Sequence, residues 1–65
     1  MDNREQLAQQ LAKWEETHRA LADEVSRLER RAFLTPEEQR RISDLKKQKL
    51  AAKDRVFELR RAVAG

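Results

Sequence analysis

Cysteine is absent from this chain of 65 residues, and glycine and proline occur once each. Without cysteine there are no disulfides and no thiolate metal ligands, which are the usual reinforcements of small secreted domains. A single glycine and a single proline leave little turn chemistry for a β-sheet protein. The longest uninterrupted apolar runs have three residues, whereas a membrane span needs about 20. These absences favour a small all-α protein of the reducing cytoplasm with no membrane segment.

Charged residues are abundant instead, at 42% of the chain. They are unevenly placed, because residues 1–34 hold six basic and seven acidic side chains, whereas residues 35–65 hold nine basic and five acidic ones. A domain of this size buries only about 60% of the surface that its unfolded chain exposes, so a lone helical unit is marginally stable. We therefore expect the chain to self-associate as a dimer or a tetramer.

Apolar positions repeat through the first half at alternating steps of four and three residues. This spacing is a heptad seam, the pattern of a helix that packs along a partner helix. The seam positions are Leu7, Leu11, Trp14, His18, Leu21, Val25, Leu28 and Ala32. No glycine or proline interrupts them, so the pattern predicts a first helix over about residues 3–32.

A helix-start signal follows at Thr35, Pro36 and Glu38. Threonine suits the N-cap, proline suits the first helical position, and glutamate three residues after the cap closes a capping box. The signal predicts a turn over about residues 33–35 and a second helix over about residues 36–63. The seam continues in that helix at Ile42, Leu45, Lys49, Ala52, Val56, Leu59 and Val63.

The two seams match when the helices run antiparallel, because the residue numbers of opposing positions then always add up to 70. The pairs are Leu28 with Ile42, Val25 with Leu45, Leu21 with Lys49, His18 with Ala52, Trp14 with Val56, Leu11 with Leu59 and Leu7 with Val63. A short connection also requires antiparallel neighbours. The sequence therefore predicts a single domain, a coiled-coil-like antiparallel two-helix hairpin.

The predicted turn carries two large apolar residues. Phe33 and Leu34 are expected to pack over the hairpin end.

A domain-swapped dimer, with one continuous helix through residues 32–36, is the alternative arrangement of the same seam. Pro36 and its capping box argue against it.

Positions beside the seam have complementary charge. Acidic or small residues of the first helix face basic residues of the second: Ala8, Glu15, Ala22 and Glu29 against Lys46, Lys53 and Arg60. Exposed ion pairs contribute about 0–1 kcal/mol each, so these pairs determine register more than stability.

Leu50 and Phe57 lie seven residues apart and off the seam, so both are exposed on an isolated hairpin. We interpret the pair as a helix-packing surface rather than a ligand pocket. It is predicted to close a homodimer into a four-helix bundle, with contact to another protein as the other possibility.

Three seam residues allow a functional as well as a structural interpretation. His18 is the only histidine, too few for a zinc site, and is either a packed core residue or a pH sensor. Lys49 is either a polar residue that sets register or a reactive lysine. Trp14 is either a core anchor or a binding hot spot. We favour the structural interpretation for all three.

A basic nucleic-acid-binding accessory protein is the alternative function. Its candidate contacts are Arg40, Lys46, Lys47 and Arg61. Acidic residues three or four positions away offset most of this charge, and neither helix-turn-helix spacing nor an aromatic platform accompanies it.

Patterns typical of enzymes are missing from the sequence. It has no Ser-His-Asp or Cys-His set and no glycine-rich phosphate loop. We therefore expect an interaction or scaffold protein with no catalytic activity, no cofactor and no small-molecule substrate.

Two parts of the chain resemble the YdcH-like family of small bacterial proteins, over roughly residues 15–58. They read His18-Arg19-Ala20-Leu21 and Val25-Ser26-Arg27-Leu28-Glu29 before the turn, and Leu45-Lys46-Lys47-Gln48-Lys49-Leu50 and Lys53-Asp54-Arg55-Val56 after it. The resemblance implies motif positions at His18, Leu21, Leu45, Lys46, Lys47, Gln48, Lys49, Leu50, Lys53 and Asp54.

The chain departs from the family pattern at two positions. Ala22 stands where an acidic residue is usual, and Ala52 where a large aliphatic residue is common. The second departure implies a looser middle layer opposite His18. Because the function of the family is unknown, the resemblance implies a small cytoplasmic helical protein and no particular activity.

Overall fold

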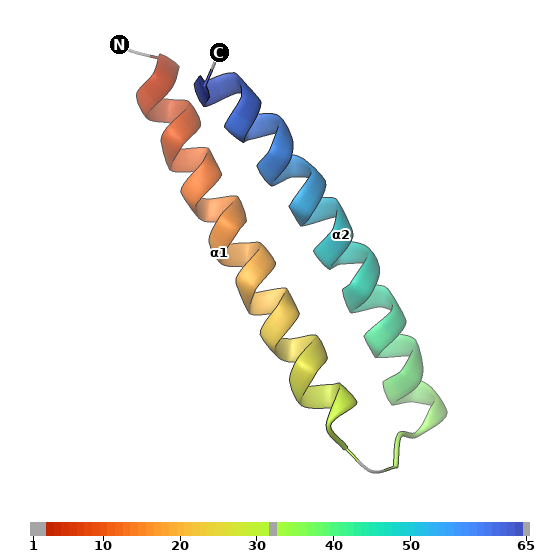
Figure 1. The fold of residues 1–65 in the computed structure, drawn as a ribbon. Helices are drawn as coiled ribbons and strands as arrows, with labels where there is room; N and C mark the ends of the chain where they lie inside the picture. Colours follow the sequence, from red (N-terminus) through yellow and green to blue (C-terminus); the bar gives the residue numbers. More distant parts are fainter. Residues whose placement is uncertain (1–2, 32, 65) are drawn as a thin grey trace.

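Two long antiparallel helices form the protein in a computed structural model that describes residues 3–31 and 33–64 (Figure 1). Helix α1 spans Asn3–Glu29 and helix α2 spans Pro36–Ala64. Together they make a rod with extents of 50 × 15 × 14 Å. The predicted all-α helical hairpin is confirmed.

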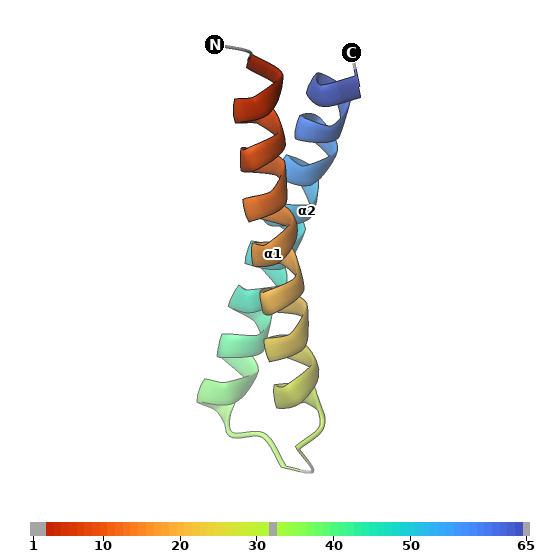
Figure 2. The same cartoon turned by 90° about the vertical axis from the view of Figure 1, so that its left-hand side faces the viewer.

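The helices cross at a shallow angle, so that they stay in contact along their length (Figure 2). Five apolar side chains of α2 are buried at the contact: Ile42, Leu45, Ala52, Val56 and Leu59. On α1 only Val25 is buried, and the other apolar seam residues are half-buried or, for Trp14, 37% exposed. Every residue that is buried in the described ranges belongs to the predicted seam, which shows that the heptad spacing identified the contact face.

A core cluster lies next to the turn. It consists of Val25, Ile42 and Leu45, against which Leu21, Leu28 and Leu34 pack. The prediction that Phe33 covers the hairpin end is wrong, because its side chain is 92% exposed, whereas Leu34 does pack there. The chain bends at Phe33 between the helices, and of the two side chains only that of Leu34 faces the core.

Helix α1 ends at Glu29, earlier than the predicted bound of about residue 32. The last bond of helical spacing runs from the Arg30 N–H to the Ser26 carbonyl, at 3.2 Å. The Arg31 N–H then donates to the Leu28 carbonyl at 3.3 Å, one residue closer, which tightens the chain into a turn. The predicted seam position Ala32 lies outside the described residues.

Helix α2 begins with a capping box. The Glu38 N–H donates to Thr35 Oγ1 at 3.1 Å, and the Thr35 N–H donates to Glu38 Oε1 at 3.2 Å. Arg31 also forms an ion pair with Glu38. The backbone hydrogen bond from Thr35 lowers the pKa of Glu38, and Arg31 acts in the same direction.

Replacing Glu38 with glutamine is expected to remove a pH-dependent contribution to stability. Because folding lowers the pKa of Glu38, its carboxylate stabilises the folded chain above the ordinary glutamate pKa. This contribution is lost as the pH falls through the lowered pKa. Melting followed by circular dichroism should therefore show wild type above E38Q at neutral pH, with the two converging in acid. A difference that stays constant into acid would contradict this, and Glu37→Gln should change the melting temperature less.

Truncation of Leu45 tests the core cluster. Leu45 is 7% exposed, so Leu45→Ala is expected to lower the free energy of unfolding by about 2–5 kcal/mol. The matched control is Leu50→Ala, the same change at a site that is 59% exposed on the same helix. Urea unfolding at low protein concentration measures both, and equal losses would show that the cluster is not the main source of stability.

Candidate interaction surface

One side of the hairpin carries a ladder of ion pairs between the helices. Glu15 Oε2 lies 2.9 Å from Arg60 Nη2, and Glu29 Oε1 lies 3.4 Å from Lys46 Nζ. In both pairs the residue numbers add up to 75, so the two pairs belong to one register of the helices and lie two heptads apart. These are two of the facing charges that the sequence predicts.

The position midway between these two pairs, the middle rung of the ladder, lacks an ion pair. By the same register Lys53 faces Ala22, which has no carboxylate. Among the residues that the structure describes, Lys53 has no ion-pair partner within 4.0 Å. The ladder therefore leaves one exposed cation uncompensated at mid-length of the hairpin.

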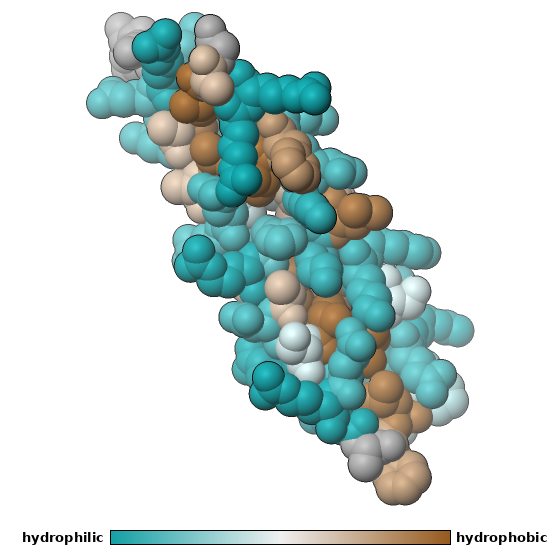
Figure 3. Space-filling model, in the orientation of Figure 1, coloured by the Kyte–Doolittle hydropathy of each residue, from teal (hydrophilic) through white to brown (hydrophobic). Residues whose placement is uncertain are grey.

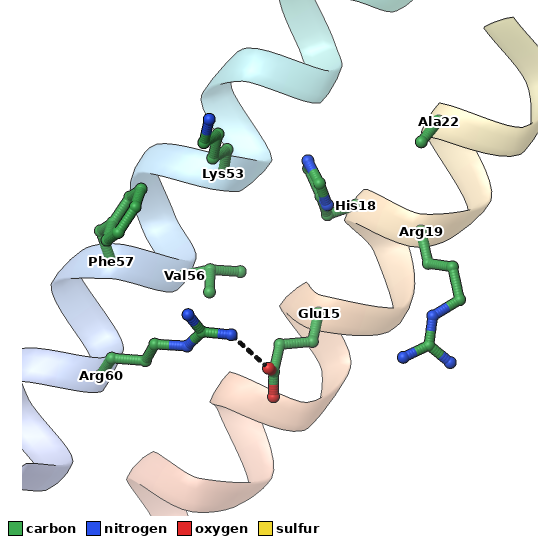
Figure 4. Close-up of a pocket in the computed structure, with 8 residues that line it drawn as sticks. All are labelled: Glu15, His18, Arg19, Ala22, Lys53, Val56, Phe57 and Arg60. Atoms are coloured by element: carbon green, nitrogen blue, oxygen red, sulfur yellow. Dashed lines mark hydrogen bonds and ion pairs between the residues drawn. The ribbon is translucent and has the colours of Figure 1, made fainter. Parts of the chain in front are cut away.

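A hollow of about 380 Å³ lies at this incomplete rung (Figure 4). Its lining comes from both helices: Glu15, His18, Arg19, Ala22, Lys53, Val56, Phe57 and Arg60. His18 and Val56 project toward the space between the helices, whereas Arg19 points away from α2 (Figure 4). Its four ionic side chains are one acid and three bases, so the hollow has a net positive charge.

Leu50 and Phe57 flank Lys53 on α2, three residues before it and four residues after it. This spacing places all three on one side of the helix. Leu50 is 59% exposed and Phe57 is 53% exposed. The space-filling view shows apolar side chains that reach the surface of α2 among charged ones (Figure 3). We call the surface formed by Leu50, Lys53 and Phe57 with Arg19 and Ala22 of α1 the open flank.

The opposite side of the hairpin is different. Arg41 Nη2 lies 2.7 Å from Glu24 Oε1, an ion pair that the sequence analysis missed. Both residues sit on the other side of the seam, and their numbers add up to 65, which is the signal that would have revealed the pair. A second hollow there, of about 520 Å³, is lined by three acids and two bases, and no large exposed apolar residue lines it.

Three seam residues, His18, Lys49 and Trp14, allow a functional as well as a structural interpretation, and the structure gives their surroundings. His18 is half-buried and lines the hollow, with no hydrogen bond to another side chain in the described ranges. Ala52 is 1% exposed, so the hollow opens beside Ala22 and not over Ala52. Lys49 is half-buried and Trp14 is 37% exposed. The roles assigned to these residues stay predictions.

The motif positions on α2 serve several faces of the helix. Leu45 lies in the core cluster, Lys46 pairs with Glu29, and Lys53 lines the hollow. Like Lys46 and Lys53, the members Lys47, Gln48, Leu50 and Asp54 are exposed. On α1, His18 and Leu21 are both half-buried. The motif residues of α2 thus contribute to the core, to the ion-pair ladder and to the exposed surface.

The candidate nucleic-acid contacts do not form one patch with Lys46. Arg40, Lys47 and Arg61 are spaced by whole heptads and lie on the outward side of α2. Lys46 instead points to α1, where it pairs with Glu29. Nucleic-acid binding stays a prediction that no described contact favours.

The fold and the open flank define a class of protein, a small all-α hairpin with a single seam. The chain belongs to the DUF465 family, because the family model, described as a protein of unknown function, matches residues 11–60. The YdcH-like family is this family, so the resemblance is confirmed. Comparison with curated proteins and with solved structures gives no match.

Residues 3–31 and 33–64 contain neither a membrane-spanning helix nor a cluster of metal ligands. Neither helix has the length and apolar character to cross a membrane. No three His, Asp or Glu side chains in residues 3–31 and 33–64 gather closely enough to hold a metal ion.

The rung between Glu15 and Arg60 can be tested with a double-mutant cycle. Because both side chains are exposed, the coupling energy is expected to be about 0.2–1 kcal/mol and to fall at high salt. Urea unfolding of Glu15→Ala, Arg60→Ala and the double variant gives the value. The same cycle with Glu16→Ala, which does not pair with Arg60, should give a coupling near zero. Equal couplings in the two cycles would show that the rung has no specific energy.

Proposed function

We propose that the protein is an interaction or scaffold module of the cytoplasm, which binds another helical surface through the open flank and catalyses no reaction. The observation that carries this proposal is the exposure of Leu50 and Phe57, at 59% and 53%, one heptad apart on one side of α2. Large apolar residues in register off the seam are typical of a second packing surface.

Energetics support a contact at this surface. Full burial of a leucine or phenylalanine side chain contributes about 1.5–3 kcal/mol relative to leaving it exposed. The hairpin is only 15 × 14 Å in cross-section, so each helix has one neighbour and little apolar area to bury. A further helix over the open flank would give α2 a second neighbour, while the small side chain of Ala22 permits close approach.

Self-association is the form of this contact that the small size of the chain favours. A second hairpin over the open flank would make a four-helix bundle, the arrangement predicted from the sequence. Such bundles bury the off-seam apolar positions of each hairpin. The ion pairs within each hairpin are compatible with this arrangement, since they involve none of the apolar residues of the flank.

Light scattering over a concentration series tests the proposal. The wild-type mass is expected to rise above the 7.7 kDa of one chain, and Leu50→Glu with Phe57→Glu should keep it at one chain with helicity retained. The control places two glutamates seven residues apart on the other side of α2, as Gln48→Glu with Arg55→Glu, and should associate like wild type. A mass that rises equally in the Leu50/Phe57 variant would overturn the role of the flank in self-association.

A further inference from the structure

The open flank presents a charge that the hairpin does not neutralise. Lys53 occupies the one rung of the ladder that lacks an acid, between the pairs Glu15–Arg60 and Glu29–Lys46. Arg19, on the α1 side of the same hollow, also has no ion-pair partner within 4.0 Å among the described residues. Neither cation is in an ion pair, and no acidic residue lies three or four positions from Lys53 on its own helix.

The arrangement on α2 is an alternation of apolar, cationic and apolar side chains. Leu50, Lys53 and Phe57 follow one another at steps of three and four residues, the spacing of one helical face. A helix that lies along this face meets the three side chains at the same spacing on its own surface. Its complement therefore has two apolar residues one heptad apart, with acidic residues between them.

We infer that the open flank binds an acidic amphipathic helix of another protein. The apolar residues of that helix cover Leu50 and Phe57, and one of its carboxylates completes the empty rung at Lys53. This inference rests on the proposed function, that the flank is a contact surface, and names the partner of that surface. The hollow provides the room for the incoming side chain, since Ala22 leaves it open (Figure 4).

A second copy of the chain is less complementary to the open flank than an acidic helix is. Around a two-fold axis that passes beside Lys53, this side chain would face Lys53 of the other copy, an unfavourable contact between like charges. The acids of the same side, Glu15 and Glu29, are already paired within each copy. Self-association through the flank is therefore expected to yield to an acidic helix.

The opposite side of the hairpin lacks this combination. Its hollow is lined by Glu24, Glu37, Arg40, Arg41 and Asp44, an excess of acid, and Arg41 is already paired with Glu24. Leu21 and Leu45 are its apolar members, and both belong to the packed seam. An acidic helix thus has a complementary surface on one side only.

Binding to designed peptides tests the inference on the full chain. The probe is a fluorescent synthetic helix with two leucines seven residues apart and glutamates between them on the same face. The comparison peptides carry glutamine or lysine in place of those glutamates. Anisotropy is expected to show the glutamate peptide bound at least about fivefold more tightly than the glutamine peptide, and the lysine peptide bound least.

Variants at the empty rung isolate the charge. Ala22→Glu supplies the missing acid to Lys53, so it should weaken binding of the glutamate peptide by about fivefold without lowering the melting temperature. Ala22→Gln adds the same bulk without the charge, so it also narrows the hollow but should weaken binding less than Ala22→Glu does. Lys53→Glu should reverse the preference toward the lysine peptide, whereas Arg55→Glu, on the other side of α2, should leave the preference unchanged.

The other possible outcomes overturn different statements, either the acidic partner alone or the proposed function as well. If the glutamate and glutamine peptides bind equally, or if Ala22→Glu binds like wild type, the flank is an apolar contact only and the acidic partner is refuted. If no peptide binds while the Leu50/Phe57 variant abolishes self-association, a second copy is the occupant and only this inference fails. If no peptide binds and wild type stays at the mass of one chain, the proposed function fails as well.

Discussion

Each helix of this protein has one neighbour, so each can bury only one stripe of its surface. The seam between α1 and α2 is therefore the whole apolar core, and other apolar side chains stay on the surface unless a further helix covers them. The two helices contribute unequally, since five of the six buried apolar residues in the described part of the chain belong to α2 and only Val25 belongs to α1. The constraint explains why a rod 15 × 14 Å in section exposes Leu50 and Phe57, residues that a larger domain would enclose.

The ion-pair ladder favours the register that the seam permits. In the observed register two rungs join an acid to a base, Glu15 to Arg60 and Glu29 to Lys46. A slip of one heptad in either direction would leave only one such rung, because Glu15 would then meet Lys53, or Glu29 would meet Lys53, while the remaining acid lost its partner. Repeating seams alone do not exclude such slips, so charges beside the seam add specificity even when their energies are small.

The helical hairpin could be predicted from the sequence because period and capping chemistry are local signals. The spacing of Leu21, Val25 and Leu28 identifies the buried face of α1, and Thr35 with Pro36 marks the break. The end of α1 and the outward position of Phe33 could not be predicted, since no glycine marks that terminus and hydrogen bonds at Ser26 and Leu28 decide it.

The candidate site was predicted in part. Leu50 and Phe57 were identified as an exposed pair, and Ala22 opposite Lys53 follows from the register. The hollow did not follow from the sequence, because it depends on how side chains such as Arg19 turn away from the seam (Figure 4). The pair of Glu24 and Arg41 was overlooked because only one side of the seam was compared.

The place of the core cluster beside the turn also gives the hairpin a direction of folding. Val25, Ile42 and Leu45 are close in sequence across the turn, so bringing them together closes only a short loop. The predicted pair of Leu7 with Val63 joins residues far apart in sequence, and both side chains are only half-buried. This arrangement favours closure of the helices from the turn outward, and we expect the end farthest from the turn to open first and most often in the folded protein.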